Sequence, residues 1–218
     1  METTGISPQT KRNLELLSKS SWLSQFYLAG GTACALYFGH RISYDLDFFT
    51  TQSFDATKIF KDLKKIGKVS AGTVADDTFL GVFDEVKISL FYYHYPNISE
   101  FANYHNIKIA SPQDLVAMKI DALQSRGTKR DFIDLYTILT QKNYSLRQAI
   151  DFFQDKFKSA NYNLEHVLMS IAYFDDAEKT PETLTLNKPI DWQQVKQFFI
   201  DQIKDFEKEN LSWKRIHQ

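Results

Sequence analysis

Hydrophobic and polar residues follow two different periods along the chain, and the period changes near residue 110. Before that point, short apolar runs with a repeat of two predict strands, whereas after it apolar residues recur every three or four positions, as in helices. The expected strands are 26–30, 42–49, 78–83, 86–93 and a last one from 107, and the expected helices are 8–20, 32–39, 55–66, 112–125, 129–141, 145–158, 163–176 and 190–208. The pattern predicts an α/β (α+β) fold with a small mixed sheet over 1–110, followed by a helical region over 111–218.

One predicted strand, ISYDLDFF at residues 42–49, places two acids on the same face. Because successive side chains of a strand point to opposite faces, Ser43, Asp45 and Asp47 would share one face. The other face would carry Ile42, Tyr44, Leu46 and Phe48. Two carboxylates in this arrangement can both reach one ion, and we expect Ser43 to orient them by hydrogen bonding.

Composition limits the classes of protein to which the chain can belong. A hydrophobic fraction of 43% with 18 Phe and 11 Tyr predicts an ordered core. No apolar run approaches the roughly 20 residues of a membrane span, and the first residues lack the layout of a signal peptide, so we expect a cytoplasmic protein with no membrane role. The single cysteine, Cys34, excludes an internal disulfide and a cysteine-rich zinc cluster and is expected in the core.

Charge is balanced over the whole chain but concentrated in one predicted helix. The net charge of −1 gives no general attraction to nucleic acid, whereas residues 58–68, KIFKDLKKIGK, carry five lysines. Four of them fall at helical spacing on one face, namely Lys58, Lys61, Lys65 and Lys68. This face is either a solvated helix surface or a surface that follows the phosphates of a polynucleotide such as RNA.

A glycine turn precedes the two acids and gives them a chemical context. Gly30 and Gly31 lie where a predicted strand meets a predicted helix, so bare backbone N–H groups at the helix N-terminus could hold phosphate. Thr32 adds a hydroxyl at the start of the same helix. A Mg²⁺ or Mn²⁺ ion on Asp45 and Asp47 could then bridge to the phosphates, which is the minimum arrangement for phosphoryl or nucleotidyl transfer.

Two other enzyme classes use aspartates separated by one residue, and the sequence fits neither. Haloacid-dehalogenase phosphatases require Thr or Val two positions beyond the second acid, where this chain has Phe49. Nucleotide-sugar glycosyltransferases place their acids after a long nucleotide-binding domain, whereas only 44 residues precede Asp45.

Two motifs, at residues 30–49 and 114–139, give the chain a family resemblance. GGTACALYFGHRISYDLDFF and DLVAMKIDALQSRGTKRDFIDLYTIL resemble the two landmarks of the nucleotidyltransferase AbiEii/AbiGii toxin family, a branch of the DNA polymerase β-like nucleotidyltransferases. The likeness spans about 28–140 and implies a polymerase β-like nucleotidyltransferase core followed by a C-terminal helical bundle. It further implies Mg-dependent transfer of a nucleoside monophosphate from an NTP, with a tRNA 3′ end as acceptor and an antitoxin protein as partner, in a toxin–antitoxin or abortive-infection pair.

The resemblance assigns roles to individual residues. It implies that Gly30, Gly31 and Thr32 contact the triphosphate, and that Asp45 and Asp47 bind the metal ion. Lys119 would neutralise phosphate charge, and Asp131 and Asp134 match the acids of the RDFIDL motif. His40 and Arg41 fill the HR before the strand. Arg126 in QSRGTKRD could bind triphosphate or RNA backbone.

Structural roles remain open for the residues of the second motif. Lys119 could be an ordinary exposed helix lysine. Asp131 and Asp134 lie at i,i+3 on one helix face and could pair with the basic residues of QSRGTKRD, each exposed pair contributing roughly 0.5 kcal/mol. The alternative for both acids is contact with the nucleotide or activation of the attacking hydroxyl.

One position departs from the pattern of polymerase β-like enzymes. These enzymes carry a third carboxylate on a later strand, where VKISLFYY offers Ser89. Serine lacks the charge for a two-metal site and is not a strong base, and the nearby Asp84 and Glu85 fall in a predicted turn. The chain is therefore either an enzyme with two metal carboxylates or a catalytically degenerate nucleotide-binding or partner-binding module. A metal phosphoesterase using the same acids is a third reading.

Overall fold

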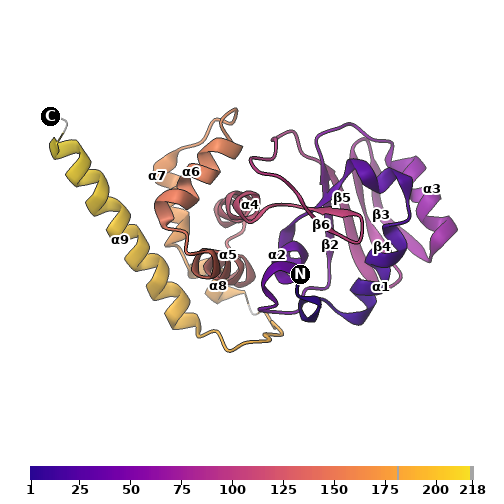
Figure 1. Ribbon diagram of the computed structural model, residues 1–218, viewed down its shortest axis with the longest axis horizontal. Helices are drawn as coiled ribbons and strands as arrows, with labels where there is room; N and C mark the ends of the chain where they lie inside the picture. The colour runs from indigo at the N-terminus through magenta and orange to yellow at the C-terminus, as the bar shows by residue number, and fades with distance from the viewer. Residues whose placement is uncertain (181, 217–218) are drawn as a thin grey trace. The chain divides into compact units, whose positions relative to one another are not determined.

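The computed structural model describes residues 1–180 and 182–216, with side chains through residue 209. The chain forms two compact units, Met1–Leu115 with Thr185–Asn187, and Val116–Leu184 with the chain from Lys188 onward. In Figure 1 the helices and strands are coloured in chain order, from indigo at the N-terminus to yellow at the C-terminus. Residues 185–187 join the first unit, although their position in the sequence places them in the helical region.

The first unit contains a mixed sheet. Within the described residues the sheet has seven strands in the order β3-β4-β5-β2-β1-β7-β6, with β2 parallel to β5, β1 parallel to β7 and the other neighbours antiparallel. The strands are β1 (Tyr27–Leu28), β2 (Leu46–Thr50), β3 (Val69–Ala75), β4 (Thr78–Phe83), β5 (Val86–Tyr92), β6 (Ala102–Tyr104) and β7 (Ile107–Ile109). The helices are α1 (Pro8–Leu17), α2 (Gly30–Phe38) and α3 (Ala56–Ile66), with the short 3₁₀ helices η1 (Thr3–Gly5) and η2 (Ser21–Gln25). The mixed α/β fold expected from the sequence is confirmed.

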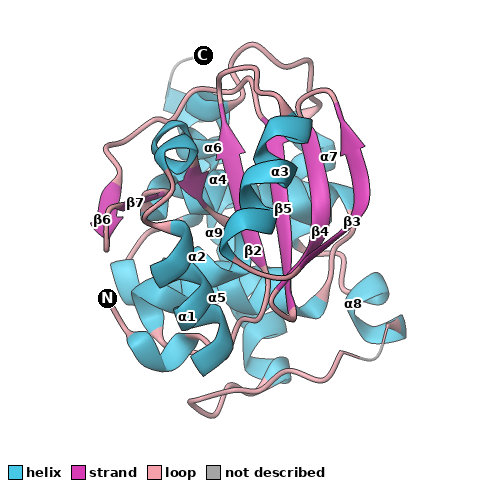
Figure 2. Cartoon of the chain, turned by 90° about the vertical axis from the view of Figure 1, so that its right-hand side faces the viewer, coloured by secondary structure: helices cyan, strands magenta, loops and turns pink. Residues whose placement is uncertain are grey.

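One face of this sheet is apolar and covered by α3. Register pairs Phe48 with Leu90 and Leu90 with Phe79, so these three buried side chains share a face. The Phe79 ring lies 5.8 Å from the ring of Phe60 on α3, and Figure 2 shows α3 lying against the strands. The N-cap Asp55, whose side chain accepts the Lys58 backbone N–H at 2.9 Å, fixes where this helix begins.

The opposite face carries the acid of the first motif. Asp47 pairs with Ser89 and Phe49 pairs with Phe91 in the parallel register of β2 and β5, so these four side chains lie together on the face away from α3. The hairpin of β4 and β5 has the turn that the sequence predicted. Strand β2 is shorter than expected, because it begins at Leu46, and Tyr44 is 52% exposed instead of lying on the apolar face.

The second unit is helical and is built around aromatic residues. Its elements are α4 (Pro112–Ser125), whose first residues belong to the first unit, α5 (Lys129–Lys142), α6 (Leu146–Lys156), α7 (Leu164–Ile171), α8 (Asp175–Lys179) and α9 (Trp192–Ile216). Phe132 of α5 contacts Phe174, Trp192 and Phe199 with ring centroids 5.0–5.9 Å apart. The segment expected as one helix over 163–176 forms α7 and α8 instead. None of the described helices is long and apolar enough to cross a membrane.

Candidate functional site

The glycine turn connects β1 to α2 and lies beside an acid. Gly30 has φ +64°, in the left-handed region that favours glycine. A Cβ on Gly30 would come within 2.8 Å of Oδ2 of Asp47, so the carboxylate lies against the bare Cα. Ala29 precedes α2 without a side-chain cap, which leaves the first backbone N–H groups of the helix to other partners. Gly30 therefore stands where a carboxylate approaches the N-terminus of α2.

Thr32 connects this helix to the segment that carries the acids. Its hydroxyl lies 2.9 Å from Oγ of Ser43 and donates to the backbone carbonyl of Asp45. Thr32 and Ser43 are both buried, and the backbone N–H of Ala29 donates to the carbonyl of Asp47 at 3.0 Å. These contacts hold the backbone of both acids next to the first turn of α2. A hydrogen bond from Ser43 to a carboxylate, which the sequence led us to expect, remains a prediction.

Asp45 and Asp47 have different backbone settings. Because β2 begins at Leu46, Asp45 is the residue before the strand and Asp47 is inside it, and both are half-buried. Within the described part of the chain, no group of three or more His, Cys, Asp or Glu is placed to hold a metal ion. Two carboxylates are a donor set that suits Mg²⁺, which takes one or two carboxylates and completes its shell with phosphate oxygens and water.

Ser89 lies next to Asp47 on the neighbouring strand. The two are direct partners in the parallel register of β2 and β5, and such partners present their side chains on the same face. Asp84 and Glu85 form the turn before β5, with φ of 40° and 69°. A hydroxyl therefore stands beside Asp47 on the neighbouring strand, and the two acids nearest in sequence lie in the turn before that strand.

Arg41 is a candidate that the sequence reasoning left outside the site. A Cβ on Gly31 would collide with its guanidinium Nη2 and would lie 3.1 Å from Oγ of Ser43. The arginine is 4% exposed, so a buried cation lies beside the glycine turn, and a guanidinium is well suited to phosphate. The HR dipeptide of the first motif was the signal that could have identified it.

Two segments distant in sequence fix the backbone around Arg41. The N–H of Ile42 donates to the carbonyl of Thr185 at 2.8 Å, and the N–H of Asn187 donates to the carbonyl of His40 at 2.9 Å. On the other side, Ser43 forms a parallel bridge with Ile6. No sequence signal indicated these contacts, because neither segment carries a motif.

In the second unit, Lys119, Asp131 and Asp134 form a buried ionic cluster. Nζ of Lys119 lies 2.9 Å from Oδ1 of Asp131 and 2.7 Å from Oδ2 of Asp134. Its side chain is 5% exposed, and the two carboxylates are fully buried. Lys119 is therefore not an exposed helix lysine, and the i,i+3 acids of α5 share one cation from α4.

Asp131 has additional partners that keep it ionised. Arg126 donates from Nε and Nη2 to its two oxygens at 2.8 and 2.9 Å, and the hydroxyl of Thr128 donates at 2.6 Å. Burial raises the pKa of Asp131, but Lys119, Arg126 and Thr128 together outweigh burial and hold the pKa well below its usual range. A carboxylate with so low a pKa is a weak proton acceptor at neutral pH, which favours a role in positioning its basic neighbours.

The lysine-rich helix lies on the sheet face opposite Asp47. Lys58, Lys61, Lys64 and Lys65 of α3 are exposed, whereas Lys68 follows the end of the helix. The Lys65 ammonium lies 2.6 Å from Oδ1 of Asp62 on the same helix. Because α3 covers the apolar face of the sheet, its lysines do not line the surface that carries Asp47 and Ser89.

A family model and one relative both match most of the chain. The model of the family described as "Nucleotidyl transferase AbiEii toxin, Type IV TA system" matches residues 13–99 and 92–214. The uncharacterized protein aq_aa25 of Aquifex aeolicus (strain VF5) is 31% identical over 205 residues, which is 92% of this chain and 97% of that protein.

Two solved structures share the fold. JHP933 from Helicobacter pylori superposes with a TM-score of 0.52 at 18% identity, covering 96% of this chain and 95% of that chain. MenT4, a nucleotidyltransferase toxin from Mycobacterium tuberculosis H37Rv, gives a TM-score of 0.62 at 13% identity, covering 89% of this chain and 80% of that chain. At these identities the likeness concerns the fold alone.

Proposed function

Because the chain belongs to the AbiEii nucleotidyltransferase toxin family, we propose that it is a metal-dependent nucleotidyltransferase with its site at the Gly30 turn. The observation that carries this proposal is the contact between the Asp47 carboxylate and the bare Cα of Gly30 at the head of α2. In the reaction, an acceptor hydroxyl oxygen bonds to the α-phosphorus of an NTP. The bond from that phosphorus to the β-phosphate oxygen breaks, pyrophosphate leaves, and the hydroxyl proton passes to solvent.

Different residues of the first unit bind the metal ion, bind the phosphates and fix the geometry of the site. Asp45 and Asp47 hold the Mg²⁺ or Mn²⁺ ion, which when bound screens the phosphate charge from the approaching oxygen. The backbone N–H groups of Gly30 and Gly31 hold phosphate oxygens at the helix N-terminus. Thr32 fixes the two elements against each other, so the reacting groups meet in a pre-arranged geometry.

In the second unit, taken by itself, Arg126 is the residue that we assign to an anion, and the buried Lys119 shares its partner Asp131. The Arg126 side chain is 52% exposed, so it can pair with Asp131 and still present N–H donors to an anion. Asp131 and Asp134 keep the Lys119 ammonium charged and in place. Within this unit, the exposed guanidinium is the group that an anionic ligand would meet first.

The proposal extends to the biological setting. The matched family is described as the toxin of a type IV toxin–antitoxin system, which supports an antitoxin protein as partner and an NTP as substrate. We propose the 3′ end of tRNA as the hydroxyl acceptor and the cytoplasm as the location.

The test follows label from each NTP into RNA. The protein is incubated with Mg²⁺, total tRNA and each of the four α-labelled NTPs, with EDTA as the metal-free control. Label in RNA together with released pyrophosphate supports the proposal, and both must disappear with EDTA. Free phosphate without labelled RNA would instead identify a metal phosphoesterase, and no label transfer from any NTP would contradict nucleotidyl transfer.

Ser89 favours a second candidate function, a nucleotide-binding or partner-binding module without turnover. A hydroxyl stands beside Asp47 where a third acid is expected, and it cannot supply that charge. In this case NTP binding would persist unchanged in Asp45→Ala and Asp47→Ala, with no product from the wild-type chain. Loss of nucleotide binding in both variants would exclude this alternative.

A further inference from the structure

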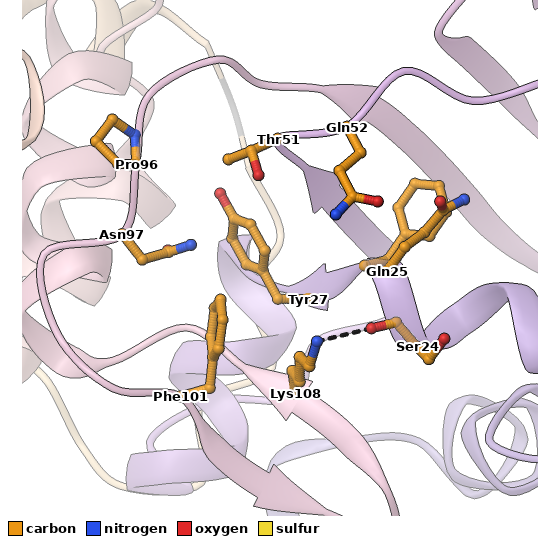
Figure 3. A pocket seen from close by; sticks show the side chains of 10 residues that line it. Ser24, Gln25, Tyr27, Thr51, Gln52, Pro96, Asn97, Phe101 and Lys108 are labelled. Carbon is orange, nitrogen blue, oxygen red and sulfur yellow. Dashed lines mark hydrogen bonds between the residues drawn. The ribbon is translucent and has the colours of Figure 1, made fainter.

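A cavity of about 410 Å³ lies at the opposite end of β1 from the glycine turn. Its volume falls in the range of roughly 300–1,000 Å³ that is usual for small-molecule sites. Figure 3 shows the side chains around it. They are Ser24, Gln25, Phe26, Tyr27, Thr51, Gln52, Pro96, Asn97, Phe101 and Lys108, all from the first unit.

Aromatic rings connect this cavity to the sheet face that carries Asp47. The Tyr27 ring stacks on the ring of Phe49 with centroids 6.0 Å apart, and it lies 5.1 Å from the ring of Phe101. Phe49 continues the row to Phe91 at 5.6 Å. Because Phe49 lies two residues beyond Asp47 on β2, the row begins about 7 Å along the strand from that acid.

The polar groups of the cavity have hydrogen-bonding capacity to spare. Tyr27 is 2% exposed, and among the described residues the carbonyl oxygen of Asn97 has no hydrogen-bond partner. Burial and the charge of Asp114 raise the pKa of Tyr27, and a hydrogen bond from the Asn97 side chain lowers it by less, so the hydroxyl remains protonated. An N–H of Asn97 bonded to this hydroxyl still leaves the hydroxyl proton and the Asn97 carbonyl oxygen for a ligand.

A cation lies at the rim of the same cavity. Nζ of Lys108 is 5.8 Å from the centre of the Phe101 ring and donates to the carbonyl of Ser24 at 2.7 Å. The lysine is exposed and the Phe101 side chain is 38% exposed. An accessible ring beside an ammonium can stack on a planar group while the ammonium meets an attached anion.

The loop that supplies Asn97 and Phe101 is held by a buried acid. Asp114 accepts the backbone N–H of Ile98 at 3.1 Å and that of Ser99 at 3.3 Å. Asp114 itself is fixed by the hydroxyl of Ser111, which donates to its Oδ2 at 2.7 Å. The cavity is therefore largely formed before any ligand arrives.

We propose that this cavity binds a nucleobase with its phosphate, as a second nucleotide site on the sheet face that carries Asp47. The rings offer stacking surfaces, the Tyr27 hydroxyl and the amides of Gln25, Gln52 and Asn97 can bond to a base edge, and Lys108 can meet the phosphate. A purely apolar ligand would leave these polar groups unsatisfied.

The proposal rests on the proposed nucleotidyl transfer for its choice among planar ligands. From Phe49, about 7 Å along the strand from Asp47, the row of rings continues to Tyr27 at 6.0 Å and on to Phe101 at a further 5.1 Å, a path that a few stacked nucleotides can follow. An acceptor strand could therefore place its end at the acids and an inner base in the cavity. A free nucleoside monophosphate has the same chemistry, and the experiment separates the two sources.

The test measures binding in EDTA, where no transfer occurs. Fluorescently labelled single-stranded RNA octamers and, separately, AMP, GMP, CMP and UMP are titrated into the full chain and its variants. The variants are Phe101→Ala, Lys108→Ala and Tyr27→Phe, the last removing only the hydroxyl. Tyr92→Ala is the matched control, because Tyr92 is an exposed aromatic residue of β5 on the other sheet face, 44% exposed. Lys142→Ala, at an exposed position near the end of α5, controls for charge.

We expect about tenfold weaker binding in Phe101→Ala. In Lys108→Ala, the slope of log affinity against log salt concentration should fall by about one. Both controls should bind within about twofold of wild type. Tyr27→Phe should weaken binding while leaving the unfolding transition unchanged. A loss seen with octamers alone identifies a base within a strand, and a loss seen with the monophosphates as well identifies a free nucleotide. Either result supports the site.

The proposal is overturned if the wild type binds neither ligand, or if all three variants bind like the controls. Its failure is distinct from failure of the proposed function. A wild-type chain that transfers label normally but is insensitive to the cavity variants would remove this site and leave the transferase. A chain that binds octamers through Phe101 and transfers nothing would remove the transferase and leave the site.

Discussion

Two pairs of aspartates, Asp45 with Asp47 and Asp131 with Asp134, come from the two family motifs and occupy opposite environments. The first pair is half-buried at the start of a strand, where one carboxylate lies against the bare Cα of Gly30. The second pair is fully buried on a helix and shares the ammonium of Lys119. The same residue type therefore serves two different purposes in one chain.

The difference shows what local geometry does to a carboxylate. A buried acid must be paired, and Asp131 has two cations and a hydroxyl within hydrogen-bonding distance. An acid intended for a metal ion must instead stay accessible to water and ligand. The first pair is half-buried, as our proposal of a metal ion requires, and the second pair holds the cations of Lys119 and Arg126 in place.

The largest expected effect is on activity and comes from the first pair. Asp47→Asn should lower nucleotidyl transfer on the order of 10²–10³-fold, because it removes charge that stabilises the reacting phosphate. The free energy of unfolding should change by less than about 1 kcal/mol, since the side chain is half-buried. Label transfer and urea unfolding measure the two quantities, with Asp76→Asn in an exposed turn as the control. Equal activity of Asp47→Asn and Asp76→Asn would contradict the proposed role of Asp47 in the reaction.

The next effect is on stability and comes from the second pair. Asp131→Ala takes one of two carboxylates from the buried Lys119 and a bidentate partner from the half-exposed Arg126, which should cost about 1–3 kcal/mol of unfolding free energy. The matched control is Asp151→Ala on α6, where the acid is exposed. Urea denaturation measures both variants. If Asp131→Ala is as stable as Asp151→Ala, the cluster does not hold the helices.

A smaller effect is expected at the glycine turn. Gly30→Ala places a side chain at φ +64° and directs its Cβ within 2.8 Å of Oδ2 of Asp47, so we expect a loss of about 1–2 kcal/mol in stability together with weaker transfer. Gly72→Ala on β3 is the control, since a Cβ there meets no atom closer than 3.7 Å. Unchanged stability and transfer in Gly30→Ala would show that the turn tolerates a side chain.

The smallest effect concerns the dependence of stability on pH. The pKa of Asp131 is lower in the folded chain than in the unfolded one, where it is about 3.9. Its contribution is therefore complete above about pH 4 and is lost as the pH falls toward the folded value. Urea unfolding between about pH 2 and 5 should show a steeper loss for wild type than for Asp131→Asn. Identical slopes would contradict the assignment.

Much of the fold followed from periodicity, and the failures have local causes. The hairpin of β4 and β5 and the start of α4 at Pro112 were predicted, because turn residues and helix-start residues specify local backbone. The beginning of β2 was misplaced, since the neighbouring strand β5 pairs only from Leu46 onward. Strand β6 was not predicted, because its three residues gain order from pairing with β7.

The site was predictable only where a motif carried it. Gly30, Asp45 and Asp47 were identified from spacing and resemblance, and the structure brings the glycine turn and Asp47 into contact. Arg41 lies in the same motif, but its burial beside Gly31 is set by tertiary packing, and the pairing of residues 185–187 with the HR segment joins segments distant in the sequence. The aromatic row is likewise formed by strand register, which no local pattern specifies.

Binding of Mn²⁺ in the presence of a non-hydrolysable NTP analogue tests the central claim most directly. Electron paramagnetic resonance counts free Mn²⁺ during titration of wild type, Asp45→Asn, Asp47→Asn and the control Asp76→Asn. We predict a nucleotide-dependent site in wild type and Asp76→Asn, weakened at least about tenfold in the other two variants. Equal Mn²⁺ affinity in all four proteins would contradict the assignment of Asp45 and Asp47 as the metal ligands.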